Sequence, residues 1–310
     1  MIWNKVPDMS KKILFGFFCL ASLQIFSADT PNSTDPEIHI YWPVDIEKPF
    51  IISSTFGESR MDHFHNGLDI AGKGIPVYPV QTGRVLWKTE AKFRPGDIPF
   101  GGGKTIVLQH AGYWSGYMHL QQINPDLDKI SELTLQTPLG KSGDTGHSGG
   151  AHLHFFIYDP INKKMINPLP YLETGIYKNI APPSALGYGI LLPDGFVNID
   201  LNKTFKMTKD YPLYARIIDS GTGIEKWGIY TFETYSEDEM KNPIQKIMFD
   251  YLSFSDNRWR TSNGKIFENV YFENWLNLGN EFKKNKKVIW KAAGYLGPET
   301  KEVIELQIKD

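Results

Sequence analysis

The sequence predicts a mainly β protein in which an antiparallel β-sheet region is followed by an Ig-like β-sandwich. Short runs rich in β-branched and aromatic residues are separated by glycine and proline, and no long amphipathic helix occurs before residue 160. The later runs are spaced like the strands of a sandwich. In the first half we expect strands at Ile38–Trp42, Ile51–Phe56, Val85–Trp87 and Thr105–Gln109. In the second half we expect them at Phe196–Leu201, Tyr211–Ile217, Trp227–Thr234, Lys246–Ser253 and Val303–Ile308.

The clearest strand pattern covers residues 151–158. Read with a period of two, it places Leu153, Phe155 and Ile157 on one side, which is apolar and therefore faces the core. His152 and His154 lie on the other side. Two imidazoles on one face of a rigid strand can hold a metal ion, or a metal ion and a base.

Composition excludes several classes of protein. With 310 residues the chain is long enough for about two domains, and 41% hydrophobic with 22% charged residues is a globular composition. A net charge of −2 argues against a nucleic-acid binder, which would need a basic surface. It also argues against a polybasic membrane-surface protein.

The N-terminal residues have the pattern of a targeting segment. Lys11 and Lys12 precede an apolar run over residues 13–26, and the small residues Ser27 and Ala28 follow it. The run is shorter than the ~20 residues of a comfortable membrane-spanning helix. We therefore expect a signal peptide over residues 1–28 and a polar linker over 29–37, with an uncleaved anchor as the alternative. We expect an exported protein located in the periplasm, outside the cell or in the cell envelope, without stable membrane insertion after cleavage.

A second motif supplies further metal-ligand atoms. His65 and Asp69 offer a nitrogen and a carboxylate oxygen four residues apart, about ninety residues before His152 and His154. Catalytic zinc takes three protein ligands and keeps a fourth position open for water or substrate. Such an ion acidifies water and polarises a carbonyl group, so an amide can be hydrolysed without a protein nucleophile. All eight histidines lie between residues 39 and 154, which places any imidazole chemistry in the first half.

These motifs resemble the LytM/lysostaphin-type zinc metallopeptidases, family M23. The resemblance is carried in order by His65-x-x-x-Asp69, by Tyr117-Met118-His119-Leu120, and by His152-Leu153-His154. It covers about residues 40–172. It implies a small antiparallel β-sheet peptidase domain over 38–175. From the pattern of the later residues we expect a linker over 176–183 and an Ig-like β-sandwich accessory domain over 184–310.

The resemblance also implies roles for single residues. His65, Asp69 and His154 would be ligands of Zn²⁺, and His119 and His152 the two unligated catalytic histidines. One would be the general base, and the other would stabilise the oxyanion or protonate the leaving amine. Which histidine takes which role stays open.

The resemblance implies a zinc endopeptidase acting on peptide cross-links of bacterial peptidoglycan. One alternative is a non-catalytic envelope module that binds peptidoglycan or activates a cell-wall amidase, and a further one is a zinc peptidase acting on protein. Partner proteins cannot be inferred from the sequence.

Several smaller signals have two interpretations. His63 could replace His65 as a ligand, although only His65 stands four residues before Asp69. Arg60 could hold a carboxylate near the site or pair at the surface, and Tyr117 could donate to an oxyanion or belong to the core. The segment 101–105 is similar to the end of a phosphate-binding loop but lacks the first glycine, and we interpret it as a turn.

Overall fold

The computed structural model describes residues 38–90, 101–173, 175–206, 209–237, 240–279 and 287–309. The expected signal peptide over 1–28 and linker over 29–37 lie outside these residues. Within the described part of the chain, no helix combines the length and the apolar character needed to cross a membrane.

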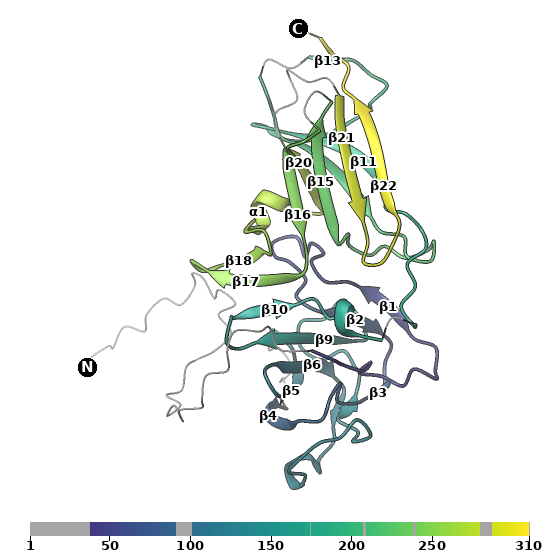
Figure 1. Ribbon diagram of the computed structural model, residues 1–310, viewed down its shortest axis with the longest axis vertical. Coiled ribbons are helices and arrows are strands. Elements are labelled where there is room, and N and C mark those ends of the chain that lie inside the picture. The colour runs from purple at the N-terminus through teal and green to yellow at the C-terminus, as the bar shows by residue number, and fades with distance from the viewer. Residues whose placement is uncertain are drawn as a thin grey trace, which may run out of the picture. The chain divides into compact units, whose positions relative to one another are not determined.

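The first half is built from short strands, as predicted (Figure 1). Two short 3-10 helices, Leu127–Lys129 and Leu169–Tyr171, are its described helical segments. The strands are β1 Ile51–Ser54, β2 Leu68–Ala71, β3 Pro76–Val77, β4 Arg84–Thr89, β5 Lys104–Gln109, β6 Trp114–Leu120, β7 Gln122–Ile123, β8 Gly140–Lys141, β9 His152–Asp159 and β10 Lys164–Ile166.

Strand β9 is the centre of the largest sheet. It pairs antiparallel with β6 on one side, and with β2 and β10 along its other side. The predicted alternation is confirmed, because Leu153, Phe155 and Ile157 are each 0% exposed. Burial of each such side chain contributes about 1.5–3 kcal/mol, which fixes the register of β9 and thereby the face that carries its histidines.

The hairpin between β9 and β10 begins at a capping aspartate. Asp159 Oδ1 accepts hydrogen bonds from the backbone amides of Ile161 and Asn162, each at 2.9 Å. This Asx-type turn reverses the chain directly after β9.

The prediction of a strand at Ile38–Trp42 is wrong. The alternation is present, since Ile38, Ile40 and Trp42 are buried, but these residues form no strand. The amide of Ile40 donates to the carbonyl of Tyr171, whereas the amide of Tyr41 donates to that of Val80. A ladder needs repeated hydrogen bonds to the same partner strand, and each of these two segments accepts only one bond from the described amides of Ile38–Trp42.

The second half is also β-rich, and its α-helix, α1, covers only Phe267–Val270. Its strands are β11 Ser184–Leu192, β12 Gly195–Ile199, β13 Phe205–Lys206, β14 Leu213–Ile218, β15 Thr231–Ser236, β16 Gln245–Met248, β17 Tyr251–Ser255, β18 Arg258–Thr261, β19 Tyr271–Phe272, β20 Trp275–Gly279, β21 Lys287–Ala293, β22 Glu299–Glu305 and β23 Ile308–Lys309. Two antiparallel sheets have the strand orders β12-β11-β14-β20-β19 and β16-β15-β21-β22 in the described residues. Buried side chains from both sheets, including Leu213, Phe232 and Trp290, belong to one core.

One hairpin of the second half belongs to the sheet of the first. The expected strand at Lys246–Ser253 is divided into β16 and β17, and β17 pairs antiparallel with β10 (Figure 1). The extended sheet has the order β18-β17-β10-β9-β6-β5-β4. Backbone hydrogen bonds therefore join the two halves, and the boundary expected at residues 176–183 stays a prediction.

Candidate metal centre

Strand pairing brings Asp69 and His154 together. In the antiparallel ladder of β2 and β9, Asp69 lies directly opposite His154. Directly opposed residues of a ladder project from the same face of the sheet. The two side chains therefore meet although 85 residues separate them, and Asp69 Oδ1 lies 2.9 Å from His154 Nδ1.

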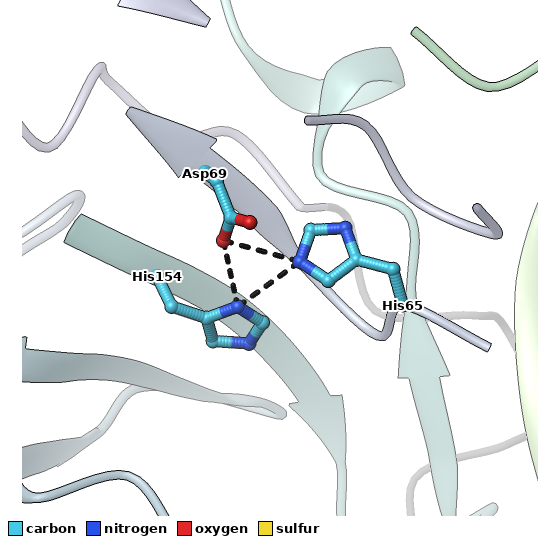
Figure 2. A group of neighbouring side chains, drawn as sticks. All are labelled: His65, Asp69 and His154. Atoms are coloured by element: carbon cyan, nitrogen blue, oxygen red, sulfur yellow. Dashed lines mark hydrogen bonds and ion pairs between the residues drawn. The ribbon is translucent and has the colours of Figure 1, made fainter. Parts of the chain in front are cut away.

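The third member of the cluster is His65, in the loop before β2. Its Nε2 lies 3.1 Å from Asp69 Oδ1 and 3.1 Å from His154 Nδ1. Its Nδ1 is 2.7 Å from the carbonyl oxygen of Thr55. A proton on Nδ1 donates to that carbonyl, so the lone pair of Nε2 points at the other two residues. Figure 2 shows the three side chains converging from separate parts of the chain.

The donor set fits a metal ion. One ligand atom from each residue lies within 4.8 Å of the others, and two nitrogens with one carboxylate oxygen form a set that Zn²⁺ accepts. Ligands of a tetrahedral zinc, each about 2.0–2.2 Å from the ion, lie about 3.3–3.6 Å apart. The observed separations of 2.9–3.1 Å are close to this.

Electrostatics put two of these residues, Asp69 and His154, in the protonation states that metal binding requires. Burial alone would raise the pKa of Asp69, but the neighbouring rings of His65 and His154 hold that pKa well below its usual value of 3.8. Burial lowers the pKa of His154 to about 4, against the opposing effect of Asp69. At neutral pH the site thus offers a carboxylate and a neutral imidazole, as metal binding requires.

Gly67 allows His154 to occupy its place. A Cβ atom at residue 67 would lie 2.4 Å from the carbonyl oxygen of Phe155 and 2.8 Å from the His154 ring. Any larger residue there would push the ring out of the cluster.

His152 and His119 lie beside the cluster with similar hydrogen bonds. Nδ1 of His152 is 2.7 Å from the carbonyl oxygen of Gly150, and Nδ1 of His119 is 2.8 Å from that of Thr145. Each Nδ1 donates to its carbonyl, so each Nε2 can accept a proton. The centroids of the His119 and His152 rings are 4.7 Å apart, and Nε2 of His152 is 3.6 Å from Asp69 Oδ1. Burial lowers the pKa of His119, which keeps it neutral and able to act as a base.

A β-bulge sets the direction of the His119 side chain. The register between β5 and β6 shifts between Lys104 and Ile106, where β6 has one extra residue. His119 has φ = 61°, in the left-handed region, and its amide donates to the carbonyl of Gly102 at 2.7 Å. A bulge re-aims a side chain and often lies next to an active site. The turn predicted at residues 101–105 is confirmed over 101–103, where it holds this backbone, whereas residues 104 and 105 already belong to β5.

The structure decides the smaller alternatives. His63 is not part of the cluster, because its side chain is 62% exposed and pairs with Asp62. Arg60 holds a carboxylate, with Nη2 2.8 Å from Asp69 Oδ2. Tyr117 is a core residue, 0% exposed, and its hydroxyl accepts from the amide of Val80.

Comparison with known proteins agrees with this geometry. Residues 63–168 match the model of peptidase family M23. This part of the chain is an M23 metallopeptidase domain.

An uncharacterized metalloprotease of Buchnera aphidicola is 34% identical over 153 residues, which cover 44% of this chain and 37% of that protein. The peptidoglycan DD-endopeptidase ShyA of Vibrio cholerae is 31% identical over 122 residues, covering 37% of this chain and 26% of ShyA. The matches thus span between about a quarter and two fifths of these relatives.

Among solved structures, the M23 domain is similar to the catalytic domain of the antimicrobial peptidase lysostaphin from Staphylococcus simulans. The identity is 24%, the match covers 39% of this chain and 91% of that domain, and the TM-score is 0.32.

Two residues that support the M23 site were not singled out from the sequence. Glu58 accepts hydrogen bonds beside the loop of His65, and Thr145 binds the ring of His119 through its carbonyl oxygen. A backbone carbonyl carries no side-chain signal, so nothing at Thr145 could have indicated this contact. Glu58 lies two residues before Arg60, and that position beside a candidate residue was its one available signal.

Proposed function

We propose that this chain is a zinc-dependent endopeptidase that hydrolyses peptide bonds in the cross-links of bacterial peptidoglycan. The observation that carries the proposal is the triangle of His65 Nε2, Asp69 Oδ1 and His154 Nδ1, with sides of 2.9–3.1 Å. A Zn²⁺ ion held by these atoms would supply the Lewis acidity that polarises a peptide carbonyl and lowers the pKa of water to about 7.

His119 and His152 are proposed to move the protons. In each ring Nε2 is the nitrogen without a proton, because Nδ1 donates its proton to a backbone carbonyl. In our proposal one imidazole takes a proton from the attacking water at Nε2, and the other, once it carries a proton on its own Nε2, donates that proton to the oxyanion or to the departing amine. Their closeness to the ligand cluster supports this division of labour.

The substrate class is supported by one relative. ShyA, named a peptidoglycan DD-endopeptidase, is 31% identical over 122 residues. We further propose export to the periplasm or the outer envelope, which the lysine-flanked apolar run before Ala28 supports. For the second half we propose an Ig-like sandwich, supported by a core that two sheets share.

The test uses the full chain loaded with zinc and intact peptidoglycan sacculi. The released fragments are identified by mass spectrometry, and new free amino groups are counted. His154→Ala should release nothing and bind no zinc. His63→Ala is the matched control, because that imidazole is nearby in the chain but exposed, and it should behave as the wild type does.

The outcomes separate the possible functions. New amino groups together with cross-link cleavage support the proposal. Binding to sacculi without new amino groups would instead support a non-catalytic envelope module. Cleavage of a protein substrate with sacculi left intact would support a peptidase of another specificity.

A further inference from the structure

The loop that carries His65 is enclosed by residues of the second half of the chain. Phe64, 4% exposed, packs edge-on against the rings of Phe267 and Phe249 at centroid distances of 5.2 and 5.8 Å. The hydroxyl of Tyr271 donates to the carbonyl of Gly57 at 3.2 Å. The position of this ligand therefore depends on residues about two hundred positions later in the chain.

A carboxylate beneath the loop joins the two halves more directly. Glu58 Oε1 accepts from the amides of Thr55 at 2.5 Å and of Gly228 at 2.9 Å. The Trp227 indole donates to the carbonyl of Ile52 at 2.8 Å, which places Gly228 against Glu58. The Glu58 side chain is only 14% exposed, so these charge-assisted hydrogen bonds are shielded from water and strong.

Glu58 reaches two of the metal ligands through one intermediate residue each. On the first path, Glu58 Oε2 lies 3.4 Å from Arg60 Nη1, and Arg60 Nη2 donates to Asp69 Oδ2 at 2.8 Å. Because Arg60 occupies Oδ2, Oδ1 is left to face His65 and His154. On the second path, Glu58 fixes the amide and the hydroxyl of Thr55, whose carbonyl oxygen binds His65 Nδ1.

We propose that Glu58 is a positioning residue of the metal centre, and that the Trp227–Gly228 segment of the second half holds it in place. The inference rests on the proposed function only in taking zinc as the metal. It assigns the second half a role in metal affinity, separate from any role in binding the cell wall. Loss of a group that hydrogen-bonds a metal ligand directly typically weakens metal affinity 10–100-fold, and Glu58 holds two such groups, Arg60 and the carbonyl of Thr55.

The test displaces the Glu58 side chain by a substitution in the second half of the chain. In Gly228→Ala the new Cβ would lie 2.5 Å from Glu58 Cγ and would displace the carboxylate. Gly228 is not in the left-handed region, so alanine itself is tolerated by the backbone. The matched control is Gly187→Ala in β11, where the new Cβ would meet its nearest neighbour, Trp275, at an ordinary 3.6 Å.

The readout is the affinity of the full chain for zinc, without substrate, measured by competition with a chelating dye. The visible absorption of the Co²⁺ form reports the ligand geometry. We expect zinc affinity to fall at least 10-fold in Gly228→Ala with an altered Co²⁺ spectrum, and to stay within 2-fold of wild type in Gly187→Ala. Glu58→Gln is the second variant, should Gly228→Ala fail to fold, and the same loss is expected.

Equal zinc affinities in the wild type, Gly228→Ala and Glu58→Gln would overturn this inference and leave the proposed function standing. A wild-type chain that binds no zinc would overturn both.

Discussion

Replacing His119 by glycine and by alanine should separate the effect of backbone strain on stability from the effect of the lost imidazole on activity. His119 has φ = 61°, a conformation that costs a residue with a Cβ about 1–2 kcal/mol. Glycine avoids this cost but loses about 0.5–1 kcal/mol relative to alanine through its more flexible unfolded chain. His119→Gly should therefore be more stable than His119→Ala by about 0.5–1 kcal/mol. At an ordinary strand position the order would be the reverse.

The comparison isolates the backbone, because both variants lose the same imidazole and the same hydrogen bond to the carbonyl of Thr145. Urea unfolding of the two zinc-loaded chains gives the difference in free energy. Both variants should keep zinc and lose activity about 10²–10⁴-fold, the usual contribution of a general acid or base. An alanine variant more stable than the glycine variant would refute the strain argument, and a fully active one would refute the catalytic role.

Three further predictions follow from the site and its surroundings. Chelation should abolish activity and lower the melting temperature, and zinc should restore both in the wild type but not in His154→Ala. Gly103→Ala should reduce activity at least 10-fold, measured on sacculi, because φ is 63° and the new Cβ would lie 2.3 Å from the backbone of Thr145, which orients His119. Burial lowers the pKa of His110 from its usual 6.5, so its contribution to stability is present above pH 6.5 and is lost as the pH falls below it. His110→Gln should make unfolding free energy less dependent on pH in that range, and an unchanged dependence would contradict this.

The pattern of the central strand was fully readable from the sequence. Leu153 and Phe155 alternate with His152 and His154, and a period of two on a buried strand leaves few alternatives. The apolar side is completely buried, as expected, and His154 on the other side is buried too, at 7% exposed. The alternation of apolar and polar residues was therefore enough to predict which face of β9 carries the imidazoles.

The meeting of the ligands could not be derived from the pattern. Asp69 faces His154 because β2 pairs with β9 in one register, and residue spacing does not specify which strands pair. The resemblance to family M23 supplied that information. The pairing of β10 with β17 and the hydrogen bond between Gly228 and Glu58 arise from tertiary packing of the two halves. Neither contact leaves a local signature in the sequence.

Ile38–Trp42 shows the limit of the alternation rule. Its buried residues at every second position are correct, yet its described amides make only a single hydrogen bond to each neighbouring segment. Alternation reports which side of an extended segment is buried. It does not report whether one continuous partner strand is available.

The most direct test of the central claim is an anomalous difference map at the zinc edge, from crystals of the full chain grown with zinc. We predict a single strong peak about 2.0–2.2 Å from each of His65 Nε2, Asp69 Oδ1 and His154 Nδ1. A map without a peak between these atoms, or with the ion held by His119 or His152 instead, would contradict the account.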